Sequence, residues 1–232
     1  MKYAVPVPQT YNLAIAGSDD LFPVHRIFCV GRNYAAHARE MGKDPDRDPP
    51  FFFMKPACAI VSANENPVDI PYPPMTANFH HEIELVVTIG KGGKDIPEAQ
   101  ALDHVHGYAV GLDMTRRDLQ LEARDKGRPW EFGKSFAQSA PIGPVSTVSG
   151  IGHLSSATIS LTVNDQARQS SDIDKLISSV AESIAYLSRY ETLVPGDVIM
   201  TGTPEGVNAV VPGDVMRGHI DGLTDIVVRV AK

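Results

Sequence analysis

The feature that most constrains this chain is how densely glycine and proline interrupt it. The 232 residues include 19 glycines and 18 prolines. Together these make up about 16% of the chain, against roughly 12% in an average protein. Because both residues tend to end regular elements, the sequence favours short strands joined by turns over long helices. We therefore predict a mostly β protein with two or three helices.

Composition narrows the class of protein further. Apolar residues make up 43% of the chain and charged residues 21%, the balance of a soluble globular protein. The net charge of −7 argues against nucleic acid as a partner, because nucleic acid attracts cationic surfaces. No stretch approaches the roughly 18 apolar residues of a membrane span, and no signal peptide is evident. Cys29 and Cys58 are too few for a disulfide framework, so we predict buried free thiols and a cytoplasmic protein.

The length and turn pattern predict one domain over residues 26–232, with residues 1–25 as an extension packed against it. We expect strands at 27–30, 51–54, 81–89 and 108–113, with a tight hairpin turn at 91–93. Helices are expected at 33–41, 115–127 (with Asp118 as a capping acid) and 172–190. Two Pro-Gly-Asp-Val segments, at 195–198 and 212–215, are predicted to be hairpin turns that lead into strands. The polar, proline-rich stretch 43–50 is predicted to be a loop and a candidate lid.

Three carboxylates stand out within apolar strands. Glu82 and Glu84 are two residues apart in a predicted strand and therefore share a face. Like charges this close repel, and burying them unpaired would cost several kcal/mol, a cost that a divalent cation removes. Asp113 ends another apolar strand and adds a third acid. Three carboxylates without a thiolate suit Mg²⁺ or Mn²⁺ better than zinc, although a strand end facing water is the alternative.

A histidine and a lysine carry weaker signals. His37 and Glu40 are three residues apart on a predicted helix, so they are either a general base held by a carboxylate or an ordinary surface pair. Lys134 could stabilise a developing negative charge if it is buried.

Two further patterns are less specific. The glycine-flanked turn 201–206 could hold a carboxylate through its backbone N–H groups, but it matches no nucleotide-binding pattern. His104 and His106 have the spacing of metal ligands, which is more typical of ordinary core or surface histidines.

Taken in order along the chain, these segments resemble the fumarylacetoacetate hydrolase family, specifically its short single-domain members. The matching segments span about residues 25–230. They are Gly31-Arg32-Asn33-Tyr34-Ala35-Ala36-His37 with Glu40, Phe53-Met54-Lys55-Pro56, His81-Glu82-Ile83-Glu84-Leu85, Gly107-Tyr108, Asp113 to Gln120, Lys134-Ser135-Phe136 and Thr201 to Val207.

The resemblance implies a mixed β-sandwich roll, a homodimer and one Mg²⁺ or Mn²⁺ ion per chain. It implies the following roles: Glu82, Glu84 and Asp113 as metal ligands, His37 and Glu40 as the pair that activates water, Lys134 as the group that stabilises negative charge, and Arg117, Gln120 and Thr203 as substrate contacts. Arg47, in the candidate lid, is a further candidate partner for a distal carboxylate. Long members of the family carry a fourth metal carboxylate, but residues 31–33 contain no acid, so three carboxylates completed by water are expected.

A narrower resemblance, carried by residues 51–56 and the N-terminal segment, is to members that hydrolyse acylpyruvates, fumarylpyruvate in particular. The implied reaction is metal-dependent cleavage of a C–C bond in a 2,4-diketo acid, which gives pyruvate and a second acid in aromatic-acid breakdown. Relatives that decarboxylate oxaloacetate, or that isomerise or decarboxylate hydroxymuconate-type diacids, remain alternatives. A non-enzymatic binder of keto acids is a third possibility.

Overall fold

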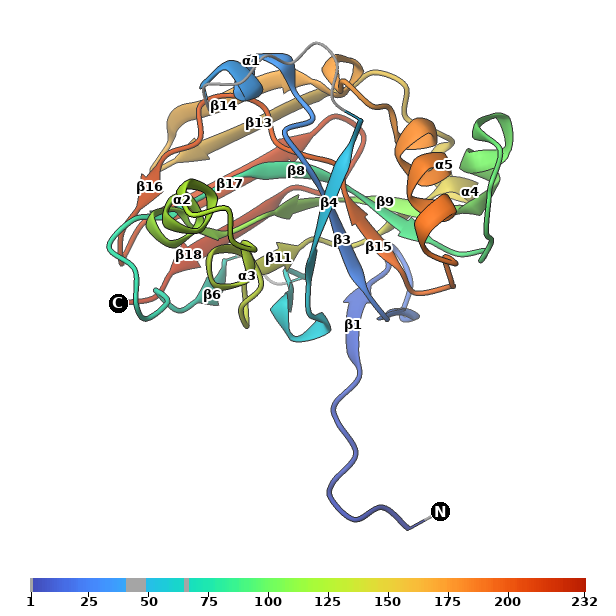
Figure 1. Cartoon of the computed structure of the whole chain (residues 1–232), viewed down its shortest axis with the longest axis horizontal. Coiled ribbons are helices and arrows are strands. Elements are labelled where there is room, and N and C mark those ends of the chain that lie inside the picture. Colours follow the sequence, from blue (N-terminus) through green and yellow to red (C-terminus); the bar gives the residue numbers. More distant parts are fainter. Residues whose placement is uncertain (1, 41–48, 65–66) are drawn as a thin grey trace.

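Two β-sheets packed face to face form the body of the protein in a computed structural model that describes residues 2–40, 49–64 and 67–232 (Figure 1). The larger sheet contains eight strands. Seven of them follow the order β4 (Phe51–Lys55), β3 (Ile27–Gly31), β15 (Val198–Met200), β8 (Ile83–Ile89), β9 (Val105–Leu112), β11 (Ala140–Ile142) and β5 (Ile60–Ser62), and β12 (Ser146–Thr147) pairs with β9. The second sheet has the order β14 (Gln166–Asp172), β13 (Thr158–Val163), β17 (Val215–Ile220), β18 (Ile226–Val230) and β6 (Val68–Ile70).

Smaller elements complete the fold. Three short strands, β10 (Thr115–Arg116), β7 (Phe79–His80) and β16 (Ala209–Val210), form a third sheet, and β1 (Tyr11–Ala14) pairs with β2 (Leu21–Val24). The α-helices are α1 (Ala35–Glu40), α2 (Arg117–Asp125), α3 (Glu131–Lys134), α4 (Val148–Ile151) and α5 (Val180–Tyr190). Single 3-10 turns occur at η1 (Ala57–Ala59) and η3 (Ile173–Lys175), and a longer one at η2 (Glu98–His104). The mostly β mixed sandwich expected from the sequence is confirmed.

Alternation along β8 explains how the sandwich and the site share one strand. Ile83, Leu85 and Val87 belong to the core between the two sheets. Glu84 and Val86 point to the other face of the larger sheet, because successive side chains in a strand alternate. Val86 packs there in a second apolar cluster. The carboxylate of Glu84 is therefore placed by the same periodicity that builds the core.

The N-terminal segment divides into two parts. Leu13 of β1, and Phe22 and Val24 of β2, are buried in the second apolar cluster, so residues 11–24 pack on the body. Residues 2–10, which the sequence analysis also placed against the body, are exposed and extend away from it (Figure 1).

All three predicted helices begin later than expected, and α1 starts at Ala35 rather than at residue 33. Residues 115 and 116 form β10, and α2 starts at Arg117 without a side-chain cap. Asp118 accepts hydrogen bonds from Thr76 Oγ1 and the Ala77 N–H, so it ties down a neighbouring loop. Residues 173–175 form only a 3-10 turn, and the long helix starts at Val180, after a capping box made by Ser179 and Glu182.

The turn predictions were also partly wrong. No tight hairpin forms at 91–93, because β8 and β9 are joined by a longer connection that includes η2. The two Pro-Gly-Asp-Val segments do lead into β15 and β17, but neither joins two paired strands. Both cysteines are free, with Cys29 buried and Cys58 only half-buried.

Candidate active site and metal centre

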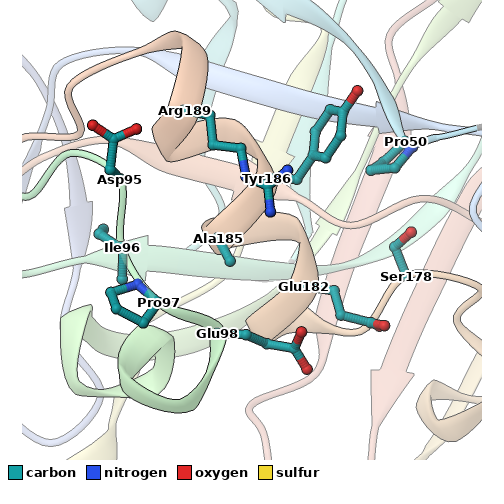
Figure 2. Close-up of a pocket in the computed structure, with 10 residues that line it drawn as sticks. All are labelled: Pro50, Asp95, Ile96, Pro97, Glu98, Ser178, Glu182, Ala185, Tyr186 and Arg189. Atoms are coloured by element: carbon teal, nitrogen blue, oxygen red, sulfur yellow. The ribbon is translucent and has the colours of Figure 1, made fainter.

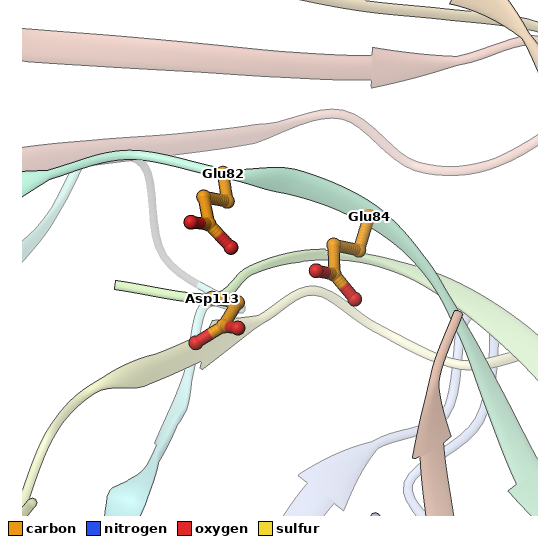
Figure 3. Close-up of side chains that lie close together, drawn as sticks. All are labelled: Glu82, Glu84 and Asp113. Atoms are coloured by element: carbon orange, nitrogen blue, oxygen red, sulfur yellow. The ribbon is translucent and has the colours of Figure 1, made fainter. Parts of the chain in front are cut away.

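Three carboxylates converge where β8 and β9 lie side by side. Glu84 lies on β8, Glu82 immediately precedes that strand, and Asp113 immediately follows β9. A hydrogen bond of 2.8 Å from the Asp113 N–H to the Glu82 carbonyl joins the two strand ends. One oxygen from each carboxylate lies within 4.8 Å of the others, and the side chains point toward one another (Figure 3). All three residues are buried, at 4%, 2% and 0% exposure for Glu82, Glu84 and Asp113.

Three buried cations surround this cluster. Lys134 Nζ lies 2.7 Å from Glu82 Oε2 and 2.6 Å from Asp113 Oδ2, so it bridges the two carboxylates. Arg117 donates from Nη2 to the other oxygen of Glu82. Lys55 Nζ lies 2.8 Å from Asp113 Oδ1. The ion pairs therefore balance Glu82 and Asp113, whereas Glu84 has no cationic partner among the described residues.

The pKa values reflect this imbalance. Burial, together with the charges of Asp113 and Glu82, raises the pKa of Glu84 well above its ordinary value. Burial alone would also raise the pKa of Glu82, but the charges of Lys134 and Arg117 outweigh burial and lower it. Burial opposes the charge of Lys134, yet Asp113 and Glu82 hold the pKa of this lysine above its usual value. The cluster thus contains one carboxylate, that of Glu84, whose charge no ion-paired cation balances among the described residues.

This donor set fits a divalent cation. Carboxylate oxygens are the ligands that hard ions such as Mg²⁺ and Mn²⁺ prefer, and a cation beside Glu84 would supply the missing charge. Glu84 Oε2 also accepts a hydrogen bond of 2.8 Å from the Gly202 N–H, which fixes its orientation. Within the described residues this is the only such group of potential ligands. His104 and His106 are not part of it, since His104 bonds to the Lys91 carbonyl and His106 stacks on Phe22.

His37 and Glu40 lie together beside this cluster on α1. His37 Nδ1 is 3.4 Å from Glu40 Oε2, and the Gly206 N–H donates to both carboxylate oxygens of Glu40 at 3.1 and 3.3 Å. Burial lowers the pKa of His37. The ring is therefore neutral at pH 7 and has a nitrogen available to accept a proton.

A single cavity of about 20 Å³ connects these groups. It is lined by predicted metal ligands, catalytic residues and substrate contacts, namely Glu82, Glu84, Asp113, His37, Lys134, Arg117, Gln120 and Thr203. Val30, Gly31, Arg32, Phe53 and Trp130 complete the lining. Glu40 lies behind His37 and does not line it. Arg47, the candidate contact in the lid, and most of that predicted lid lie outside the described residues.

Two buried residues at this site, Lys55 and Gln169, were not predicted from the sequence to have a role there. Lys55 is 1% exposed and donates to the Met114 carbonyl at 3.2 Å and to Ser139 Oγ at 2.9 Å, in addition to its ion pair with Asp113. A lysine that ends an otherwise apolar strand was the available signal. Gln169, on β14, bonds to the loops that carry Glu82 and Thr203. Nothing in its local sequence pointed to the site, because it lies on a strand of the other sheet.

A larger surface hollow lies elsewhere, between α5 and the loop before η2 (Figure 2). Its volume is about 480 Å³, and its charged lining residues are Asp95, Glu98, Glu182 and Arg189. None of the residues that the sequence analysis assigned to catalysis or metal binding lines it. The convergence of titratable groups marks the smaller cavity as the candidate active site.

The fold and site define the class of protein. The family model for the C-terminal domain of fumarylacetoacetate (FAA) hydrolase matches residues 26–231, and the chain belongs to that family.

Two of the similar proteins are fumarylpyruvate hydrolases. The chain is 47% identical over 188 residues to the enzyme from a Ralstonia species, an alignment that covers 80% of this chain and 96% of that protein. The crystal structure of fumarylpyruvate hydrolase from Pseudomonas aeruginosa, in complex with Mn²⁺ and pyruvate, superposes with a TM-score of 0.98 at 58% identity and covers 99% of both chains. A mitochondrial oxaloacetate tautomerase from Oryza sativa is 40% identical over 207 residues, covering 89% of this chain and 91% of that protein.

The part of the chain that the structure describes contains no helix long and apolar enough to span a membrane.

Proposed function

We propose that this protein is a metal-dependent hydrolase that cleaves the C–C bond of an acylpyruvate, with fumarylpyruvate as the substrate. The observation that carries the proposal is the charge of the buried cluster at the cavity. Three buried carboxylates lie beside three buried cations, Lys55, Arg117 and Lys134, so this cluster is neutral overall, and the half-buried Arg32 adds a positive charge to the cavity lining. A divalent ion bound to the carboxylates would leave the buried cluster with two positive charges. A dicarboxylate such as fumarylpyruvate would neutralise them, because buried charges are stable only when paired.

Glu82, Glu84 and Asp113 are the residues we assign to the ion, either Mn²⁺ or Mg²⁺. The Mn²⁺ and pyruvate complex of the Pseudomonas relative supports this assignment. When bound, the ion would supply Lewis acidity that stabilises negative charge on the keto acid. Arg117, Gln120 and Thr203 line the same cavity and are assigned to binding the acid.

His37 would act as the general base. Its Nδ1 faces Glu40, so Nε2 would take the proton from water, and the resulting hydroxide would attack the acyl carbonyl carbon. The bond between that carbon and C3 of the pyruvyl unit would then break, and C3 would receive a proton. The products would be pyruvate and fumarate. The ammonium group of Lys134 would face the negative charge that develops on the leaving pyruvyl group.

A substrate panel tests this reaction directly. The Mn²⁺- or Mg²⁺-loaded protein should consume fumarylpyruvate faster than maleylpyruvate or acetylpyruvate, as followed by loss of diketo-acid absorbance and appearance of pyruvate. In H₂¹⁸O, one ¹⁸O atom should enter the fumarate carboxylate and none the pyruvate carboxylate. The chelated protein is the control. No pyruvate from any diketo acid would contradict the proposal.

The similarity to oxaloacetate tautomerases and to a Dictyostelium oxaloacetate decarboxylase supports a second candidate, which uses the same site without attacking water. Oxaloacetate in the same panel separates the two functions. Tautomerisation or CO₂ release that exceeds the rate of fumarylpyruvate hydrolysis would favour the second.

We also propose a cytoplasmic homodimer that acts in aromatic-acid breakdown, with 26–232 as its catalytic domain. Light scattering tests the dimer, because a mass near the 25.1 kDa of one chain would contradict it.

A further inference from the structure

A buried glutamine of the second sheet bonds to two segments that carry residues of the active-site cavity. Gln169 lies on β14 and is 2% exposed. Its Oε1 accepts from the Ile83 N–H at 3.1 Å and lies 2.9 Å from His81 Nδ1. Its Nε2 donates to Thr203 Oγ1 and to the Pro204 carbonyl, both at 2.8 Å. One amide therefore joins the segment that carries Glu82 to the loop that carries Thr203.

Two backbone groups fix the orientation of this amide. The Ile83 N–H can only donate, so it must face Oε1, and the Pro204 carbonyl can only accept, so it must face Nε2. Thr203 Oγ1 then accepts a hydrogen bond from Gln169 Nε2. Its own proton has no acceptor among the residues that the structure describes. Because Thr203 lines the cavity, that proton is available for donation to a bound molecule.

The backbone of β14 holds the same loop in place. Gly206 has a φ of +91°, and a Cβ there would lie 2.1 Å from the Arg168 carbonyl oxygen. The loop therefore packs directly on β14, next to Gln169. Close packing at this position leaves Thr203 little freedom to turn away from the cavity.

We infer that Gln169 is a positioning residue: by donating to Thr203 Oγ1, it directs the threonine hydroxyl proton into the cavity, toward the carboxylate of the keto acid. This inference rests on the proposed function, which places such a carboxylate there. Gln169 itself does not line the cavity and acts through Thr203.

Replacement of the Gln169 amide by a carboxylate changes the hydrogen bond to Thr203 and keeps the hydrogen bond to Ile83. In Gln169→Glu with the carboxylate ionised, one oxygen still accepts from the Ile83 N–H, whereas the other loses the bond to the Pro204 carbonyl and faces Thr203 as an acceptor that draws the hydroxyl proton away from the cavity. The dissociation constant of pyruvate for the Mn²⁺-loaded protein, measured by titration calorimetry, should rise about 10- to 100-fold, the usual weight of a hydrogen bond to a charged group. Mn²⁺ affinity without pyruvate should remain within about twofold of wild type, because the segment that carries Glu82 keeps its bond.

A double-mutant cycle distinguishes this role from a merely structural one. Thr203→Val should weaken pyruvate binding to a similar degree, Gln169→Glu should add no further loss to it, and Thr203→Ser should restore the dependence on Gln169. Gln166→Glu places the same charge at an exposed position on β14 and should leave pyruvate affinity unchanged. If Gln169→Glu does not fold, Gln169→Met takes its place in the cycle, because it removes the donor to Thr203, together with the acceptor of the Ile83 N–H, without adding charge.

The inference would be overturned if the fold-losses of pyruvate affinity in Gln169→Glu and Thr203→Val multiplied in the double variant. It would also be overturned if Gln169→Glu bound pyruvate as tightly as wild type, or if the wild-type protein did not bind pyruvate. Because binding is measured at equilibrium, a protein that binds pyruvate but hydrolyses no diketo acid would contradict the proposed function alone.

Discussion

Replacement of Glu84 by glutamine should stabilise the metal-free protein and destabilise the metal-loaded one. Glu84 is 2% exposed, and the nearest oxygens of the three carboxylates lie within 4.8 Å of one another. At an effective dielectric constant of about 20, two charges at that distance repel by about 3 kcal/mol, and Glu84 faces two of them. Protonation of Glu84 at pH 7, starting from an ordinary pKa of 4.5, costs about 3 kcal/mol. Protonation of Glu84 therefore costs less free energy than repulsion from both neighbouring carboxylates. The cost of protonation, about 3 kcal/mol, is the most by which Glu84 can destabilise the metal-free protein.

The sign of the pH dependence follows from the raised pKa. In the folded, metal-free protein Glu84 keeps a proton that the unfolded chain has released. The loss of folding stability caused by Glu84 is therefore absent below about pH 4.5 and grows as the pH rises toward 7. Glu84→Gln removes this penalty and keeps an acceptor for the Gly202 N–H. Its free energy of unfolding in EDTA should therefore exceed that of wild type by up to about 3 kcal/mol at pH 7 and by almost nothing near pH 4.5.

Added Mn²⁺ should reverse this order. At a concentration 1,000 times its dissociation constant, a ligand stabilises the folded state by about 4 kcal/mol, a gain that the variant loses together with its ligand oxygen. Urea unfolding in EDTA and in Mn²⁺ measures both differences. Glu122→Gln, which removes an exposed carboxylate paired with Lys126, is the matched control and should change stability by less than about 0.5 kcal/mol in either condition. A variant less stable than wild type in EDTA, or an order unchanged by Mn²⁺, would refute the reasoning.

Three further results are expected. His37→Ala should lower kcat by about 10²–10⁴-fold while oxalate still binds to the Mn²⁺-loaded protein, with exposed His219→Ala as the control; undiminished hydrolysis would assign water activation to another group. The acid limb of the kcat/KM profile should have its midpoint below pH 6.5, because burial lowers the pKa of His37 and keeps the base neutral in more acidic solution; a midpoint above 6.5 would contradict the assignment. Lys134→Met should destabilise the metal-free protein by about 3–5 kcal/mol by leaving the carboxylates of Glu82 and Asp113 short of countercharge, and Mn²⁺ should recover part of that loss in urea unfolding; equal losses with and without Mn²⁺ would argue against a shared cation site.

Local periodicity accounts for what could be predicted of the fold. Alternation along residues 81–89, of which 83–89 form β8, predicted both a strand and the shared face of Glu82 and Glu84, because a two-residue repeat leaves few alternatives. The ends of the helices were less predictable. Residues 115 and 116 became a strand because they pair with β7, a partner far away in the sequence.

The residues of the candidate site were likewise predictable where a local pattern marked them and not where they depend on distant partners. The acidic cluster could be predicted because each of its carboxylates interrupts or ends an apolar strand. Lys55 and Gln169 reach the cluster only through packing, one from β4 and one from the second sheet. Their distance along the chain from Asp113 and Thr203 left no local pattern that could connect them.

If Glu82, Glu84 and Asp113 together hold one divalent ion, crystals soaked in MnCl₂ and measured at the manganese absorption edge should reveal it. We expect one anomalous peak per chain, within coordination distance of an oxygen from each of the three carboxylates, and no such peak in Glu84→Gln crystals. A peak at any other group of side chains, or none in the wild-type crystals, would contradict it.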